Sequence, residues 1–172
     1  MVQKVQETQS LEQMLCFAVY STAHAFNRAY RPLLEALDLT YPQYLVMNAL
    51  WEGDGQNVKG LAHRLLLDSG TMTPLLKRLE AAGLVQRKRD GADERQVIVY
   101  LTETGRMLRE RADDVPETIR CATGLSAKEM QTVIDQILRL RGSLSDFAEN
   151  SASAEQADIA SAPAPRRRAA KV

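Results

Sequence analysis

The sequence predicts a mainly helical fold that carries one small β-hairpin, and two patterns lead to this prediction. Apolar residues recur every three or four positions through most of residues 11–148, as they do along the buried face of a helix. Between them, Leu84–Arg89 and Gln96–Leu101 are short runs separated by turn residues, the second rich in β-branched side chains. The chain has 172 residues, of which 45% are hydrophobic and 26% charged, a composition typical of one globular domain.

The first predicted helix covers residues 11–37. Ser10 and Gln13 have the spacing of a capping box at its start, and Pro32 is expected to kink it. Apolar and small side chains spread around most of its circumference, which indicates burial on more than one side. A chain of this length has little interior for such a helix, so we expect a dimer interface to cover it.

Three shorter helices are predicted next, over residues 41–52, over residues 58–66, and from a turn at Asp68–Gly70 to Gly83. Pro74 leaves the start of the third one open, because its nitrogen cannot donate the intrahelical bond that a start at Ser69 would require. Two short helices followed directly by a hairpin predict a winged helix-turn-helix over about 41–101, with the second helix sized for the DNA major groove.

The end of the chain is predicted to be helical up to residue 148. Thr102 caps one helix, which Pro116 is expected to break, and Ser126 and Glu129 form a second capping box. After Phe147 the composition changes to mostly Ala, Ser, Pro and Arg. We therefore expect an N-terminal arm over 1–10, one domain over 11–148, and a disordered tail over 149–172.

Positive charge is concentrated in the predicted helix-turn-helix, although the whole chain has 22 basic and 22 acidic residues. Seven basic residues stand against two acidic ones between Lys59 and Arg89. A solvated strand face would account for Arg87–Arg89 alone, but the helix pair directly before it favours a surface for DNA phosphates. The residues expected to contact DNA are Ser69, Thr71, Thr73, Lys77, Arg78, Arg87, Lys88 and Arg89.

Several other classes of protein are disfavoured by composition. The longest uncharged run, residues 13–27, contains Gln, Ser, Thr, His and Asn, so it cannot span a bilayer, and we expect no signal peptide and no membrane partner. A cytoplasmic protein is expected, with its two cysteines at rest as thiols. The two cysteines and two histidines lack metal-ligand spacing, so we expect neither a metal site nor a cofactor.

Five blocks along the chain resemble the MarR family of bacterial transcription regulators. In order, they are Leu61–Leu65, Thr71–Glu80, Gly83–Arg87, Asp93–Arg95 and Leu101–Gly105. The resemblance implies a homodimer held together by helices at about 11–37 and 103–148, with double-stranded operator DNA as its partner. It also implies that Arg95 reaches the minor groove from the wing, with Asp93 as its local carboxylate partner.

The first helix resembles a narrower group in that family, the organic hydroperoxide-resistance regulators (OhrR). The segments that carry this resemblance are Leu15–Tyr20, Ala29–Leu33 and Leu39–Tyr44. The resemblance implies that Cys16 is a peroxide-reactive thiol, and that Tyr20, Tyr30 and Tyr41 bond to it around a pocket for hydrophobic peroxides. It further implies that Cys121 is the resolving cysteine of the two-cysteine branch.

Helical spacing limits how these residues can meet. Cys16 and Tyr20 are four residues apart and share one helical face. Tyr30 follows Cys16 by 14 residues, or roughly 21 Å along a helix, so these two can meet only across a twofold axis near Ala23. Cys16 has no basic residue at neighbouring positions, and Glu12 one turn earlier disfavours a thiolate. Tyrosine hydroxyls and the nearby helix N-terminus are the remaining means of stabilising the anion.

The expected function is that of a redox-sensing repressor and not of an enzyme. Organic hydroperoxide oxidises Cys16 to a sulfenic acid, Cys121 of the partner subunit condenses with it, and the disulfide moves helices and releases the operator. Alternatives stay open at this point: each cysteine taken alone fits a small structural residue, and Tyr30 fits an interface aromatic. A small aromatic ligand in the cleft between dimer and DNA-binding elements would release DNA without thiol chemistry. A thiol peroxidase is less well supported, because no thioredoxin-like βαβ pattern occurs.

Overall fold

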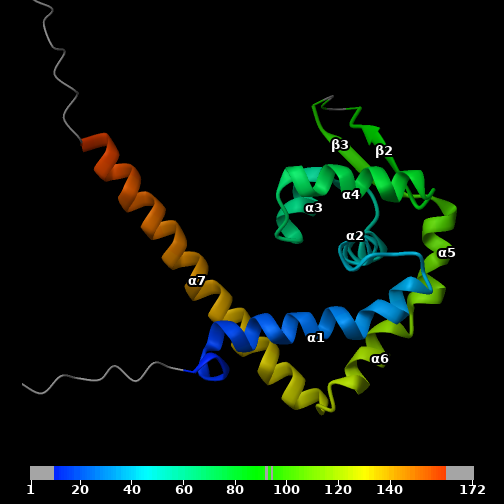
Figure 1. The fold of residues 1–172 in the computed structure, drawn as a ribbon. Coiled ribbons are helices and arrows are strands. Elements are labelled where there is room, and N and C mark those ends of the chain that lie inside the picture. Colours follow the sequence, from blue (N-terminus) through cyan, green and yellow to red (C-terminus); the bar gives the residue numbers. More distant parts are fainter. Residues whose placement is uncertain (1–9, 92, 94, 162–172) are drawn as a thin grey trace, which may run out of the picture. The chain divides into compact units, whose positions relative to one another are not determined.

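A computed structural model describes residues 10–91, 93 and 95–161, and these residues divide into two compact units between Thr123 and Gly124. The fold is mainly helical with one small β-hairpin, as the sequence predicts, and a third short strand extends the hairpin to an antiparallel sheet (Figure 1). None of the helices in the described ranges has both the length and the apolar character that a membrane crossing requires.

The first helix begins later than predicted. A single 3-10 turn, η1, covers Leu11–Gln13, and α1 covers Leu15–Glu35. Met14 lies between them in an extended conformation, with φ of −81° and ψ of 124°. The predicted capping box at Ser10 is wrong, because the turn that follows Ser10 ends at Met14 and Ser10 makes no side-chain cap bond. Pro32 lies inside the last turn of α1.

The helix-turn-helix is made by α3 and α4, and α2 packs beneath α4. These helices cover Tyr41–Glu52 (α2), Val58–Arg64 (α3) and Ser69–Ala81 (α4). Thr40 and Gln43 form a capping box at the start of α2, and the side chain of Asp68 caps α4 by accepting a bond from the Thr71 N–H at 2.8 Å. The turn predicted at Asp68–Gly70 is therefore wrong: Asp68 starts the helix, and Pro74 is tolerated inside it.

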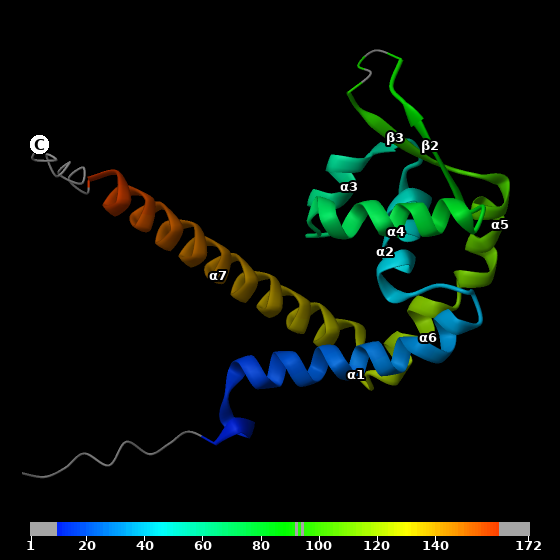
Figure 2. The ribbon, with the colours of Figure 1, turned by 45° about the horizontal axis from the view of Figure 1, so that its top comes forward.

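The wing is an antiparallel sheet in the order β1-β3-β2. Its strands are Gln56–Asn57 (β1), Val85–Arg89 (β2) and Val97–Leu101 (β3), and Arg87 pairs with Val99 in the hairpin. Both hairpin strands match their prediction, whereas the two residues of β1 are too few to produce an alternating pattern. In Figure 1 α4 lies between the hairpin and α2, and Figure 2 shows the hairpin extending away from α4.

The core of this unit lies between the helix-turn-helix, the sheet and α2. Its most deeply buried side chains are Val46, Met47, Leu61, Met72, Leu79 and Val99. The helix α5, Glu103–Ala112, packs directly on the entrance to β2, because a Cβ at Gly105 would lie 2.0 Å from the carbonyl oxygen of Leu84. The Trp51 indole N–H donates to the Gly105 carbonyl at 2.9 Å and ties α2 to the same point. A short helix, α6, covers Val115–Ala122.

The second unit contains the helix α7, Ala127–Ser161. Ser126 and Glu129 form the predicted capping box at its start, with the Ser126 N–H donating to Glu129 at 2.9 Å. The irregular tail predicted from residue 149 is wrong as far as Ser161, because the helix continues to that residue. The alanine, glutamate and glutamine residues of this stretch are strong helix formers. The arm over 1–9 and the tail over 162–172 lie outside the described residues.

Candidate DNA-binding surface and thiol site

The helix α4 is amphipathic and turns a polar face to solvent. Met72, Leu75, Leu76 and Leu79 are buried in the core. The opposite side exposes the residues predicted for DNA contact on this helix, namely Ser69, Thr71, Thr73, Lys77 and Arg78. The sequence therefore identified the exposed face of the recognition helix correctly, and this face carries hydroxyls at its start and two cations further along.

The two threonine hydroxyls already donate within the helix. Thr71 Oγ1 donates to the Asp68 carboxylate at 2.8 Å, and Thr73 Oγ1 donates to the Ser69 carbonyl at 2.9 Å. The bonds from Thr71 lower the pKa of Asp68 below its usual value, so its charge persists at the helix start. The hydroxyl protons that we expected to bond to DNA are therefore donated within the helix. The hydroxyl oxygens of these exposed residues remain available as hydrogen-bond acceptors.

Arg87 is bound to Glu80 across the junction between α4 and β2. One carboxylate oxygen of Glu80 accepts the backbone N–H of Arg87 at 3.0 Å, and the other accepts Nε at 2.9 Å and Nη2 at 2.5 Å. The two side chains are only 28% and 36% exposed. These bonds lower the pKa of Glu80. Arg87 thus holds the wing on the recognition helix with its charge compensated, which differs from the phosphate contact that the sequence suggested.

The outer cations of the wing are not paired in this way. Lys88 and Arg89 are exposed on β2, and no carboxylate in the described ranges forms an ion pair with either. The Lys88 ammonium lies 5.7 Å from the centre of the Tyr100 ring. A further cation of the basic segment, Arg64, is paired with Glu52. Within the described part of the basic segment, the cations without an ion pair therefore lie at Lys59 of α3, on α4 and on the outer half of the hairpin.

Asp93 shapes the tip of the wing instead of pairing with the Arg95 charge. Its carboxylate accepts the backbone N–H of Arg95 at 3.0 Å and the Gln96 side-chain amide at 3.2 Å. These bonds fix the chain direction at the end of the hairpin. Among the described carboxylates none forms an ion pair with the Arg95 guanidinium. Asp93 therefore supports Arg95 through the backbone, which the residue spacing alone did not reveal.

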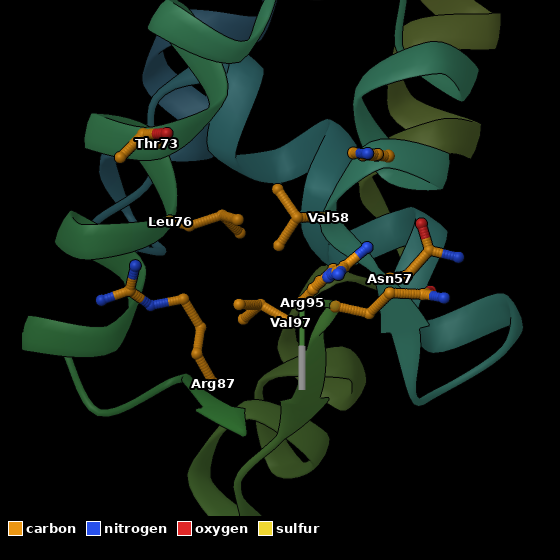
Figure 3. A pocket seen from close by; sticks show the side chains of 9 residues that line it. Asn57, Val58, Thr73, Leu76, Arg87, Arg95 and Val97 are labelled. Atoms are coloured by element: carbon orange, nitrogen blue, oxygen red, sulfur yellow. The ribbon is translucent and has the colours of Figure 1, made fainter. Parts of the chain in front are cut away.

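A hollow of about 250 Å³ lies between the helix pair and the wing. In Figure 3, Thr73 and Leu76 of α4 border one side, Asn57 and Val58 the other, and Arg87 and Arg95 approach from the hairpin. Lys59 lines it as well. The hollow is consequently bordered by three cations on the surface that carries the predicted DNA contacts.

Cys16 and Tyr20 lie on the exposed side of α1. Tyr20 is 60% exposed, and its ring packs edge to face on His24 with centroids 4.4 Å apart. The thiol of Cys16 is exposed as well, and its sulfur forms no hydrogen bond with any described residue. Within one chain, the predicted thiol and its first tyrosine therefore share a face without bonding to each other.

Tyr30 and Tyr41 meet at the junction of α1 and α2. Their ring centroids are 4.8 Å apart, and Tyr44 lies 6.0 Å from Tyr30. Burial and the neighbouring tyrosines raise the pKa of Tyr30 to about 12 and raise that of Tyr41 as well. The sequence did not identify Tyr44 as part of this cluster, although its spacing of three residues from Tyr41 was a usable signal. The cluster lies far along α1 from Cys16, as the helical rise requires.

Cys121 lies near the end of α6 between charged side chains. Its Sγ donates to a carboxylate oxygen of Glu117 at 3.5 Å, and Nη2 of Arg120 approaches the sulfur at 3.8 Å. Bonds from Arg120 and Cys121 lower the pKa of Glu117 to about 2. The thiol is exposed and unbridged. It therefore stands next to both a carboxylate and a guanidinium at the surface.

Comparison with known proteins agrees with this architecture. The family described as transcriptional regulator SarA/Rot matches residues 28–111. The regulator TtmR of Methylorubrum extorquens is 53% identical over 138 residues, which are 80% of this chain and 71% of TtmR. The organic hydroperoxide resistance transcriptional regulator of Bacillus subtilis is 46% identical over 121 residues, 70% of this chain and 82% of that protein.

Solved structures of the regulator AbfR share the fold. Reduced AbfR bound to DNA superposes with a TM-score of 0.66 at 34% identity, over 78% of this chain and 93% of AbfR. The disulfide form of AbfR gives a TM-score of 0.53 at 32% identity, over 76% and 91% of the two chains. The chain belongs to the MarR/SarA family of DNA-binding transcriptional regulators, which control transcription and are not enzymes.

Proposed function

We propose that this protein is a repressor that senses organic hydroperoxides through Cys16. The observation that carries the proposal is the exposed thiol of Cys16 on the same face of α1 as Tyr20, in a chain 46% identical to a Bacillus subtilis organic hydroperoxide resistance regulator. An exposed thiol is accessible to a peroxide, whereas a structural cysteine is usually buried.

The proposal includes a homodimer, because both long helices have apolar faces that need a partner. In α1, Leu15, Val19 and Phe26 are exposed, and in α7 the same holds for Val133, Ile134, Ile137, Leu138, Leu144 and Phe147. Patches of this kind mark protein interfaces. An antiparallel crossing of two α1 helices near Ala23 would place Cys16 beside Tyr30 of the partner subunit, where the high pKa of that hydroxyl keeps it a hydrogen-bond donor to a thiolate.

The chemistry begins with the Cys16 thiolate. The sulfur attacks one peroxide oxygen and the O–O bond breaks, giving Cys16 sulfenic acid and an alkoxide that takes a proton to leave as alcohol. Cys121 of the partner subunit then attacks the sulfenic sulfur, the S–O bond breaks, and the hydroxyl leaves as water with the thiol proton. The Cys121 sulfur lies between two charged groups, the Arg120 guanidinium at 3.8 Å and the Glu117 carboxylate at 3.5 Å. The disulfide form of AbfR, 32% identical to this chain, supports a disulfide switch in the family.

Release of DNA follows from the geometry of the dimer. A disulfide requires Cα atoms roughly 4.4–6.8 Å apart, so its formation moves the helices that carry the two cysteines. The two recognition helices must stay about 34–36 Å apart to fit one turn of DNA. A change in that separation breaks the contacts we assign to Ser69, Thr71, Thr73, Lys77, Arg78, Lys88, Arg89 and Arg95.

A second candidate is a repressor released by a small aromatic ligand. A hollow of about 180 Å³ between α2 and the α5–α6 region favours it, because Trp51 and Arg109 line the hollow and offer an aromatic face and a cation. Arg109 already donates to the Trp51 carbonyl at 3.2 Å, however, so part of its bonding capacity is used.

DNA release by cumene hydroperoxide distinguishes the two functions. Binding is followed by fluorescence anisotropy on a duplex that the reduced wild-type protein selects from a random-sequence library. We expect peroxide to release wild-type protein but not the Cys16→Ser variant, and a reductant to restore binding. If Cys16→Ser is released as readily as the wild type, the thiol mechanism is wrong. If neither responds while a small aromatic acid releases both, the second candidate replaces it.

A further inference from the structure

One helix end in this chain carries a residue poorly suited to its backbone. Positive φ angles follow the ends of four described helices, at Asp38, Leu66, Gly83 and Gly124. Glycine adopts this left-handed conformation freely and aspartate tolerates it, whereas the Cβ of other residues approaches a carbonyl oxygen too closely. Leu66, with φ of 55°, is therefore the exception.

The backbone around Leu66 cannot relax without losing the end of α3. The Leu66 N–H donates to the His63 carbonyl at 3.2 Å, and the Leu67 N–H donates to the Ala62 carbonyl at 2.9 Å. These two bonds form a Schellman motif, which requires the left-handed conformation at the intervening position. Packing of the Leu66 side chain does little to offset this backbone strain, because the residue is 69% exposed.

Leu66 lies in the turn between the two helices of the helix-turn-helix, three residues before α4 begins at Ser69. In such motifs the N-terminal end of the second helix enters the major groove. Apolar contacts in that groove are made to the C5-methyl group of thymine, and deoxyribose carbons line its edge. A strained backbone conformation that no packing contact offsets indicates a functional constraint.

We propose that Leu66 is a DNA-contacting residue, whose side chain packs against an apolar carbon of the duplex next to the bases that face α4. The contact rests on the DNA binding of the family and does not involve the thiols. It gives the protein an apolar contact beside the polar and cationic ones on α4. The strained conformation at Leu66 is the cost of placing a leucine where the turn would be more stable with glycine.

Leu66→Gly separates strain from contact, and Asp38→Gly is its matched control. Both substitutions relieve a left-handed residue at a helix end, but only Leu66 lies in the helix-turn-helix. Unfolding midpoints and affinity for the selected duplex are measured in reducing buffer, so the thiol switch plays no part. We expect Leu66→Gly to melt about 2–4 °C higher than wild type, and Asp38→Gly to shift the midpoint less, because aspartate already tolerates the left-handed conformation. Leu66→Gly should bind DNA ~10-fold more weakly, as expected when a leucine side chain is removed from an apolar contact, while Asp38→Gly keeps wild-type affinity.

Two further arms identify the partner of Leu66. Leu66→Asn, which tolerates the left-handed region and is polar, should weaken binding as Leu66→Gly does. Duplexes with single thymines replaced by uracil show whether a methyl group is the partner: wild type loses affinity at one position and Leu66→Gly does not. Affinity insensitive to every uracil assigns the contact to deoxyribose.

Two results would overturn the proposal. The first is wild-type affinity of Leu66→Gly. The second is weak binding by Leu66→Gly together with wild-type binding by Leu66→Asn, since backbone flexibility and not the missing leucine side chain would then be the cause. A wild-type protein that selects no duplex at all would instead contradict DNA binding itself.

Discussion

Replacing Arg87 with glutamine tests whether this residue holds the wing or contacts DNA. Its backbone N–H, Nε and Nη2 all donate to Glu80. The two side chains are 28% and 36% exposed, so the pair is partly shielded from water. Charge-assisted bonds of this kind contribute roughly 1.5–3 kcal/mol, and partial exposure reduces this to about 1–2 kcal/mol. Arg87→Gln should therefore destabilise the fold by that amount.

The salt dependence of DNA binding separates the two roles. Each phosphate contact contributes about 0.9 to the slope of log K against log salt concentration. Because Glu80 compensates the charge of Arg87, Arg87→Gln should leave the salt slope of DNA binding unchanged. The loss of the side-chain bonds to Glu80 should lower the free energy of unfolding, measured in urea. The matched control is Arg89→Gln on the same strand, where the cation is exposed and the slope should fall by about 0.9 for each phosphate that is no longer bound. A slope reduced by Arg87→Gln, with unfolding free energy as in wild type, would refute the assignment.

Three further predictions follow from buried or capping groups. Since the pKa of Tyr30 is raised to about 12, its stabilising effect should be complete below pH 10, the usual tyrosine value, and should be lost as pH rises through about 12; urea unfolding from pH 9 to 12 should show this loss, and Tyr30→Phe should remove it. Gly105→Ala should lower the unfolding free energy by about 3 kcal/mol, because its Cβ would lie 2.0 Å from the Leu84 carbonyl oxygen; a loss below about 1 kcal/mol would contradict this packing. Ser126→Ala should weaken the first turn of α7 by about 1 kcal/mol, seen as faster amide exchange there, while Ser143→Ala in the middle of the helix should not.

Local patterns predicted most of the elements but not every helix start. The predicted capping box at Ser126 forms, and the structure adds one at Thr40 that was not predicted. The same pattern at Ser10 does not form, because Met14 is extended and interrupts the helix after one turn. A capping box specifies hydrogen bonds within four residues, so it cannot reveal whether the following turn continues. The start of α4 shows the converse, since the Asp68 cap outweighs the bond that Pro74 cannot donate.

The exposed residues of α4 were predictable from the sequence, but the partners of the candidate site residues were not. The polar face of α4 follows directly from helical period, and its exposed threonines and cations were identified from the sequence. The pairing of Arg87 with Glu80 depends on how β2 leaves α4, which is tertiary geometry. The same holds for Tyr30 and Tyr41, which meet only because α2 packs back on α1. A contact between Cys16 and Tyr30 would require the second chain of the proposed homodimer.

A non-reducing mass measurement tests the sensing mechanism most directly. Reduced protein is treated with one equivalent of cumene hydroperoxide, denatured without reductant, and its covalent mass is determined. We expect a covalent dimer that a reductant abolishes and that neither Cys16→Ser nor Cys121→Ser forms. A monomer that has gained oxygen on Cys16 would keep the sensing thiol but remove Cys121 from the switch. A monomer of unchanged mass would contradict peroxide sensing altogether.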